Sequence, residues 1–502
     1  MLAWTIYLSF AGALIEALLP KGKPALARWF ALATAVAGLV LAVLGFAQGA
    51  GHGRMVIVDV PWVPSMGVRY TLAADGISLV LVLLTGLAAI AGVLFSWNID
   101  LRTNEFFAFY LALIGGVYGV FLSFDLFLLF VFYEIAIVPK YFLISIWGST
   151  RREYGAMKLA LYSFVGSAMV LIGLLAAYAI SGGRSTGLVE LANAGLPANF
   201  QMWAFPLVFV GFAILAGMWP FHTWAPTGHV AAPTAASMLL AGVVMKLGAY
   251  GCLRVAMSLF PHGMDPWGFS FLGIGSWRDV FAVVAVIGIV YGALVALVQS
   301  DFKFVIGYSS VSHMGFVLLG LMTLNQIGMT GAVLQMFSHG VIAGLLFAIV
   351  GRIVYERTHT RQLADLETMH LSKRLPFAAW AFVIAGMASM GLPGFSGFVA
   401  ELQVLIGSWT AKPWWTAASG VGIVVGVAYT WRALQRAFFS DAHPSAHIHD
   451  HGHELGAITW PEVAGVSMLV AVSLVVGLYP RILLDAIEPA VKALPIVAGG
   501  GQ

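Results

Sequence analysis

Six ionisable side chains stand inside long apolar stretches of this 502-residue sequence. They are Glu134, Lys140, Lys246, His313, His339 and Glu401. A charge near the centre of a bilayer costs roughly 2.5–3.5 kcal/mol, so such groups usually pair or line a water path. Desolvation favours a neutral lysine and a nearby carboxylate favours the ammonium, so neighbouring groups reset one another's proton affinity. A Glu–Lys–His–Glu series can therefore pass a proton stepwise without a metal, a nucleophile or a nucleotide.

Each of these residues also has a structural interpretation. Glu134 and Lys140 could form an ion pair, although a separation of six residues places them about 240° apart around a helix. Lys246 could extend its side chain to a membrane interface, and His313 and His339 could each satisfy a neighbouring carbonyl group. We favour proton transfer at Lys246 because it lies about 13 residues into its apolar segment, near the middle of a crossing.

Residues 212–250 combine apolar runs with the prolines, glycines and histidines of GMWPFHTWAPTGHVAAP. Prolines and glycines at this density break a membrane helix, and broken backbone at membrane depth must be buried in protein or line a wet cavity. His222 and His229 lie at the end of this break. They either cap the broken helix or take part in proton transfer.

The elements that position these residues are membrane helices, because the composition is 60% hydrophobic and only 9% charged. The net charge of +3 gives no reason to expect a nucleic-acid partner. The first 20 residues lack the basic region and cleavage site of a signal peptide, so we interpret them as a retained first span. About fourteen crossings are expected, near 2–20, 26–48, 76–97, 105–122, 126–147, 156–180, 203–224, 233–258, 278–299, 303–323, 330–354, 376–406, 414–438 and 460–480.

Residues 49–75, between the second and third crossings, alternate enough to predict a small hairpin. Fifteen lysines and arginines fall in or beside the loops after odd-numbered crossings, and eight after even-numbered ones or in the tail. The positive-inside rule then places the odd-numbered loops in the cytoplasm. The hairpin and both termini are therefore expected to be periplasmic.

An internal duplication is also expected. The fourth to eighth crossings and the ninth to thirteenth form two sets of five, and each contains one segment broken by Pro and Gly, at 217–220 and 391–394. An odd number of crossings makes the second copy inverted, as in transporters whose ion path lies between inverted repeats. The predicted parts are 1–104 with three helices and the periplasmic hairpin, 105–258, 278–438, and 439–502 with a His-rich cytoplasmic loop, the last helix and the tail.

We find no glycine-rich phosphate loop, cysteine cluster or haem motif, and expect the single Cys252 to be a packing residue. The histidines between His443 and His453 could chelate a metal, but we favour a solvated loop. Glu16 and Asp125 stand near crossing ends, where solvation is expected. No cofactor and no metal is predicted for this chain.

Six stretches resemble a known family. They are LAADGISLVLVLLTG (72–86), FYEIAIVPKYFLISIWG (132–148), PFHTWAPTGHVAAPTAASMLLAGVVMKLGAYG (220–251), IGYSSVSHMGFV (306–317), MFSHGVIAGLLF (336–347) and GLPGFSGFVAELQVLIGS (391–408). Together, and in this order, they resemble the antiporter-like proton-pumping subunits of respiratory complex I over nearly the whole chain. The similarity is greatest to the M-type members, the counterparts of mitochondrial NADH dehydrogenase subunit 4, because position 401 is a glutamate and not a lysine.

The resemblance implies roles for individual residues. Glu134 would be the fifth-span glutamate that gates the channel with a seventh-span lysine, and Lys246 the central lysine. His313 and His339 would extend the polar axis to Glu401, the acid at the exit to the non-cytoplasmic side. Lys158 matches a frequent lysine at the start of the sixth span.

Three positions depart from the family pattern. The seventh-span lysine is replaced by Leu215, the family's Asp by Thr227, and an apolar residue by Lys140. We hypothesise that Lys140 supplies the positive charge that position 215 has lost.

The resemblance implies a proton-translocating subunit of an NADH:quinone oxidoreductase in the bacterial inner membrane, with antiporter-like membrane subunits on both sides. Quinone and NADH would be handled only by other chains. Two alternatives stay open: a subunit of a multisubunit Na⁺/H⁺ (Mrp-type) antiporter or of a related membrane-bound hydrogenase, and a structural spacer that has lost its pump.

Overall fold

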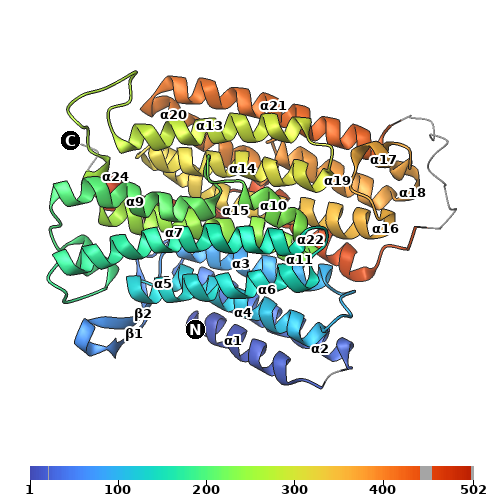
Figure 1. Cartoon of the computed structure of the whole chain (residues 1–502), viewed down its shortest axis with the longest axis horizontal. Helices are drawn as coiled ribbons and strands as arrows, with labels where there is room; N and C mark the ends of the chain where they lie inside the picture. The colour runs from blue at the N-terminus through green and yellow to red at the C-terminus, as the bar shows by residue number, and fades with distance from the viewer. Residues whose placement is uncertain (21, 441–454, 499–502) are drawn as a thin grey trace.

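The computed structural model describes residues 1–20, 22–440 and 455–498. Long helices lie side by side, with α1 and α2 along one flank and α20 and α21 along the other (Figure 1). Twelve helices among the described residues are long and apolar enough to cross a membrane. Helix α1, and the pair α19 and α20 taken as one broken crossing, bring the number to the predicted fourteen.

Three helices and a hairpin open the chain. The helices are α1 (Ala3–Leu18), α2 (Pro24–Gly49) and α3 (Gly76–Phe95). The predicted hairpin is confirmed: β1 (Met55–Val63) pairs antiparallel with β2 (Val68–Ala74) through the 3-10 turn η1 (Pro64–Met66). Gly67 ends this turn at φ +66°, a conformation that favours glycine. Asp75 then begins α3 by accepting a hydrogen bond from the Ser78 N–H at 3.0 Å.

The fourth to eighth crossings follow. They are α4 (Thr103–Leu122); α5 (Leu126–Ile135) with α6 (Ile137–Trp147); α7 (Arg152–Ile180); α9 (Ala198–Ala216) with α10 (Trp224–Ala231); and α11 (Thr234–Leu239), π-helix η2 (Leu240–Val244), α12 (Met245–Gly251) and π-helix η3 (Cys252–Met257). The fifth crossing is interrupted at Ala136 because Pro139 has no N–H to bond the carbonyl of Ile135. Short α8 (Leu188–Ala192) and η4 (Pro261–Met264) lie in the connections.

The ninth to thirteenth crossings repeat this pattern. They are α13 (Trp277–Val298); α14 (Phe302–Met322); α15 (Gln326–Ala348) continued by π-helix η5 (Ile349–Tyr355) and α16 (Glu356–Thr358); α19 (Pro376–Ser389) with α20 (Ser396–Ala411); and α21 (Pro413–Phe438). Short helices α17 (Leu363–Glu367) and α18 (Leu371–Arg374) precede α19. The chain closes with α22 (Trp460–Leu478), α23 (Arg481–Lys492) and α24 (Pro495–Ala498).

The two broken crossings end their first helices in the same way. At the end of α9, the Met218 N–H bonds the Ala213 carbonyl at 3.0 Å and Gly217 adopts φ +81°. At the end of α19, the Leu392 N–H bonds the Met387 carbonyl at 3.2 Å and Gly391 adopts φ +70°. This C-terminal cap needs a left-handed residue, which glycine supplies without steric cost. Sequence analysis predicted the two breaks, but it assigned each of these crossings as one continuous segment, 203–224 and 376–406.

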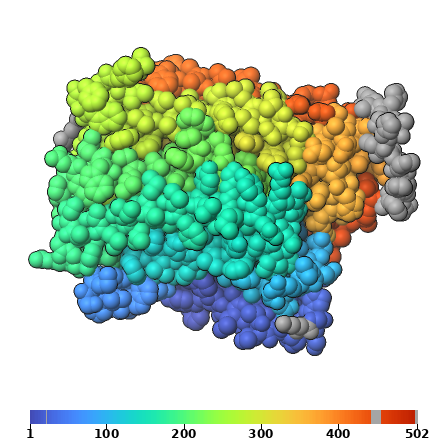
Figure 2. All heavy atoms as spheres, viewed as in Figure 1, coloured from blue at the N-terminus to red at the C-terminus, as the bar shows by residue number. Residues whose placement is uncertain are grey.

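Burial increases toward the middle of the molecule. The eighth and eleventh crossings are wholly buried and α3 nearly so. Helix α7 instead covers the middle of one face (Figure 2), where Met157, Leu161, Phe164 and Val165 are exposed. An apolar outer surface around a closely packed interior is expected of a protein in a bilayer. The two wholly buried crossings carry Lys246 and His339.

Several charges that the sequence assigned to solvent or loops are buried. Glu16 is completely buried because α1 packs along α2 and α4. Asp125 is also buried. Its carboxylate caps the N-terminus of α5 and accepts hydrogen bonds from the Leu128 N–H at 3.0 Å and the Thr186 hydroxyl at 2.5 Å. The expectation of solvation was wrong at both positions.

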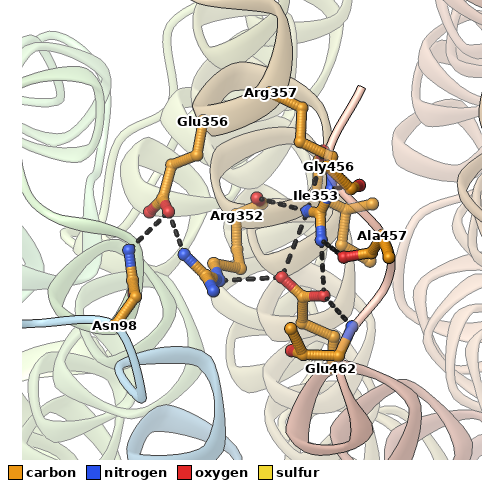
Figure 3. A network of polar contacts seen from close by, with 9 residues as sticks. Asn98, Arg352, Ile353, Glu356, Arg357, Gly456, Ala457 and Glu462 are labelled. Carbon is orange, nitrogen blue, oxygen red and sulfur yellow. Dashed lines mark hydrogen bonds and ion pairs between the residues drawn. The ribbon is translucent and has the colours of Figure 1, made fainter. Parts of the chain in front are cut away.

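A polar network joins the eleventh crossing to the fourteenth (Figure 3). The fully buried carboxylate of Glu462 accepts a hydrogen bond from Arg357 at 2.7 Å and forms an ion pair with Arg352, whose Nε lies 2.8 Å away. Arg352 also pairs with Glu356, which accepts from the Asn98 amide at 2.6 Å. The network lies near α16, at the end of the molecule opposite the hairpin (Figure 1). It holds α22 in place, so these arginines are structural partners and not free loop charges.

Candidate proton-transfer site

Lys246 and His339 meet at the buried centre of the molecule. The Lys246 Nζ lies 2.7 Å from the His339 Nδ1, and the same ammonium group donates to the carbonyl of Ala241. Ala241 belongs to the π-helical turn η2, directly before the helix that carries Lys246. π-Helical turns inside α-helices are frequent at functional sites, because they displace one side of the helix. Here the turn lies where the lysine meets the histidine of the eleventh crossing.

The histidine pair continues this contact toward the tenth crossing. The rings of His313, from α14, and His339, from α15, have centroids 5.5 Å apart and planes inclined by 32°. The Nε2 of His339 is buried and has no hydrogen-bond partner among the described residues. The distance between the His313 and His339 rings is too long for a direct hydrogen bond between them. The Nε2 of His339 is therefore free to exchange a proton.

Glu401 ends the series. Its Oε1 lies 3.0 Å from the His313 Nδ1 and accepts from the Gln335 amide at 3.3 Å. The Ser389 hydroxyl lies 3.3 Å from the other His313 nitrogen. Sequence analysis missed Gln335, although it stands four residues before His339 and so on the same face of the helix. The glutamine and the serine fix the orientation of the imidazole ring.

The carboxylate of Glu401 also lies against the break of the twelfth crossing. Its Oε2 would be only 2.8 Å from a Cβ atom at Gly391, so the glycine makes room for the charge. A cavity of about 10 Å³ is lined by His313, Ser389, Glu401 and Tyr429. That volume is about the minimum for a single water molecule. At Glu401 the series therefore ends beside a helix break and a small polar cavity, and not against tightly packed apolar side chains.

Lys246, His339, His313 and Glu401 thus form one series across four helices, α12, α15, α14 and α20. Glu134 and Lys140 stand apart from it. Lys140 is buried and its Nζ has no hydrogen-bond partner among the described residues. Glu134 acts on it electrostatically, but no ion pair between the two was found in the described part of the chain.

Leu215 lies close to the central lysine. It is buried in the last turn of α9, and a Cβ atom at Gly248 would approach the Leu215 carbonyl carbon to 3.0 Å. The last turn of α9 therefore packs directly on the helix turn that holds Lys246. Tyr133 of the fifth crossing packs against Phe212 of α9 with ring centroids 5.5 Å apart. An apolar segment thus lies between the fifth crossing and Lys246.

The other three predicted residues line the broken seventh crossing. The Lys158 Nζ lies 3.3 Å from the Thr227 hydroxyl, where the family carries an aspartate. The His222 ring packs against Tyr291 at 5.2 Å, and the His229 ring against Phe347 at 5.0 Å. The ring nitrogens of both histidines are buried without hydrogen-bond partners among the described residues. The structure does not connect these three residues to the Lys246 series by direct contact.

Sequence analysis missed two further buried cations by counting them with the loops. Lys303 is buried at the start of α14 and donates to the Ala232 carbonyl at 3.1 Å. Arg254 is buried in η3 and donates to both oxygens of Asp75, at 2.7 and 2.6 Å. Both stand within about one turn of a crossing end, where sequence alone does not separate a packed charge from a solvated one.

No cluster of three or more His, Cys, Asp or Glu side chains suited to a metal ion occurs in residues 1–20, 22–440 and 455–498. The tract from His443 to His453 lies outside the described residues.

The sequence matches the family described as "NADH:quinone oxidoreductase/Mrp antiporter, TM" over residues 123–426. The chain belongs to this family. The matched segment contains all nine predicted site residues, from Glu134 to Glu401, and both broken crossings.

Individual relatives cover nearly the whole chain. The NADH-quinone oxidoreductase subunit M of Rhodobacter capsulatus is 35% identical, over 98% of this chain and 96% of the relative. The NAD(P)H-quinone oxidoreductase chain 4 1 of Synechococcus sp. (strain JA-2-3B'a(2-13)) is 37% identical, over 91% of this chain and 85% of the relative. These similarities confirm the resemblance to the M-type branch of the family.

Solved structures show the same fold. A chain of respiratory complex I from Thermus thermophilus with bound NADH superposes with a TM-score of 0.86 and 26% identity, covering 98% of this chain and 100% of that chain. A chain of the Mrp complex from Dietzia sp. DQ12-45-1b has a TM-score of 0.82 at 22% identity, covering 98% and 97%. The second similarity concerns the fold alone.

Proposed function

We propose that this chain is a proton-translocating membrane subunit of an NADH:quinone oxidoreductase. The observation that carries the proposal is the buried series from Lys246 through His339 and His313 to Glu401. The Lys246–His339 and His313–Glu401 contacts each join a proton donor to an acceptor, and the two histidine rings lie next to each other between these contacts. A change of charge at one group alters the proton affinity of the next. The relatives at 35–37% identity, all quinone oxidoreductase chains by name, support this parent complex.

Energy for transport must reach this chain from its partners. Moving one proton against 100 mV requires about 2.3 kcal/mol, and the series contains only side chains that exchange protons. The chain therefore acts as a non-redox subunit without a cofactor of its own, driven through neighbouring antiporter-like membrane subunits. We place it in the bacterial inner membrane with both termini periplasmic, following the distribution of lysines and arginines.

Glu134, Lys140, Lys158, His222 and His229 belong to the cytoplasmic half of the path in this proposal. The resemblance to the family supports all five, and Lys140, His222 and His229 are also buried. Lys140 takes the place of the seventh-span lysine, because it is a buried cation in the same crossing as Glu134 and its Nζ has no hydrogen-bond partner among the described residues.

The decisive experiment measures protons released per electron pair in liposomes that contain the reconstituted parent complex with Lys246→Ala. We expect a lower ratio at a retained rate of NADH oxidation. The exposed Lys373 provides the matched control, and Lys373→Ala should keep the ratio. An unchanged ratio in Lys246→Ala would favour the structural spacer, and sodium-dependent pumping without redox partners would favour the Mrp-type antiporter.

A further inference from the structure

A cavity of about 400 Å³ opens at the hairpin end of the molecule. Residues 52–54 before β1, helix α8, the end of the eighth crossing and the helices α23 and α24 line it. Figure 1 shows the hairpin and α24 at this same end. The proton-transfer site does not include any residue of the cavity. Pockets of this size are large enough for a small organic ligand or a lipid head group.

Two arginines converge on one wall of the cavity. The guanidinium of Arg254 lies 5.0 Å from the ring centroid of Phe124, and that of Arg54 lies 5.9 Å from the same ring. Asp75 balances the charge of Arg254, whereas Arg54 is exposed and His52 lines the same cavity. Because one carboxylate faces two guanidinium groups, the polar wall carries net positive charge.

Arg254, which lines this wall, has one side-chain donor without an acceptor. Its side chain is 4% exposed, and its Nε is buried with no hydrogen-bond acceptor among the described residues. An unsatisfied buried donor is costly, and more so on a charged group. An anionic oxygen that reaches Nε would remove this cost. Guanidinium groups suit phosphate oxygens particularly well, since their planar fork donates more than one hydrogen bond.

The cavity lies where the eighth crossing ends, at Ser258, and part of its lining is an apolar wall. Leu188, Val189 and Leu494 belong to it. Helix α23 is strongly amphipathic: Leu483, Ile487 and Val491 are buried, whereas Arg481, Asp485, Glu488 and Lys492 are exposed. This apolar face packs on α3 and α15. The cavity therefore presents a cationic wall and an apolar wall at the ends of crossings, where lipid head groups lie.

We infer that this cavity is a binding site for the phosphate group of an anionic phospholipid. The phosphate accepts hydrogen bonds from Arg54 and from the Nε of Arg254, and the glycerol and first acyl carbons lie against the apolar wall. Basic pockets between membrane helices are a recurrent form of lipid recognition. Free inorganic phosphate shares the recognition chemistry of the cationic wall but leaves the apolar wall unfilled.

Hydrogen–deuterium exchange of the purified parent complex in detergent gives a local test. The amide protons of 188–194 and 489–495 are followed after addition of phosphatidylglycerol, phosphatidylcholine or inorganic phosphate. The double variant Arg54→Gln with Arg254→Lys removes both guanidinium groups, and with them the free Nε, while keeping a cation opposite Asp75. Arg184→Gln is the control, since Arg184 is exposed and does not line the cavity.

Phosphatidylglycerol should slow exchange of both segments in the wild type and in the control. In the double variant its apparent affinity should fall about ten- to a hundredfold, as expected for the loss of charge-assisted hydrogen bonds. If the double variant does not assemble, Arg54→Gln alone should show at least part of this loss, since Arg54 is exposed. Three results would each overturn the lipid site. Phosphatidylcholine could protect the two segments as well as phosphatidylglycerol does, or inorganic phosphate could protect them while phosphatidylglycerol does not. The third is an unchanged response to phosphatidylglycerol in the variants.

Discussion

Replacing Gly391 by alanine tests the Glu401 end of the proton-transfer series. The new Cβ would lie 2.8 Å from the Glu401 Oε2, so the carboxylate must move. The substitution also destabilises the backbone at this position by about 1–2 kcal/mol, because φ +70° is a left-handed conformation that alanine rarely adopts. The charge-assisted bond between Glu401 and His313 is worth roughly 1.5–3 kcal/mol. Its loss would reduce the population of the connected state about ten- to a hundredfold.

Gly217→Ala is a matched control within the same chain. Gly217 caps the equivalent break at φ +81°, and its new Cβ would meet only the terminal methyl of Met245, at 2.6 Å. A flexible methionine end can rotate away, so this variant carries a similar backbone cost without displacing a carboxylate. The two variants therefore separate the strain of the break from the position of Glu401.

The assay measures protons released per electron pair by the reconstituted parent complex, together with its thermal stability. Both variants should lose similar stability, and only Gly391→Ala should lower the proton ratio. An equal fall in both variants would show that the break itself, and not the carboxylate, controls transport. A normal ratio in Gly391→Ala would refute the role of the Glu401–His313 contact.

Three further predictions concern other parts of the chain. Lys140→Met should lower proton pumping and the added Leu215→Lys should restore it, whereas intact pumping in Lys140→Met alone would end the hypothesis of a displaced lysine. Glu462→Gln should destabilise the complex by about 3–5 kcal/mol in thermal unfolding, since it leaves two buried arginines without their carboxylate; an unchanged melting temperature would contradict this. The hydrogen bond from Arg69 holds the pKa of Asp59 below its usual 3.8. The stability that this bond gives the hairpin is therefore present above pH 3.8 and lost as the pH falls through the lowered pKa. The protection factors of residues 55–74, which correct for the intrinsic pH dependence of amide exchange, should fall between pH 5 and 2 in the wild type but not in Asp59→Asn.

The local chemistry of the chain could be predicted from its sequence. The number of crossings, the hairpin and both helix breaks follow from apolar length, alternation and the placement of glycine and proline. The buried charges could also be identified, because an ionisable residue inside a long apolar run is conspicuous. Six such residues were found in this way, and four of them form the central series.

Which of those residues meet is decided only by the tertiary structure. Lys246 and His339 are 93 residues apart, and His313 and Glu401 are 88 apart. The wholly buried helices are apolar on all sides, so their sequences carry no periodic signal of the face that packs on a given neighbour. Glu134 and Lys140 are near in sequence, yet no ion pair joins them in the described structure, because the helix between them is interrupted at Ala136.

Burial at the ends of crossings was likewise settled by packing. Arg254 and Lys303 lie where a long side chain can reach water, and only the helices around them enclose their charges. The cationic cavity at the hairpin end depends on this, since it combines residues 52–54, the eighth crossing and the last two helices. The sequence therefore determined which groups carry charge into the membrane, and the packing of uniformly apolar helices determined which of those groups touch.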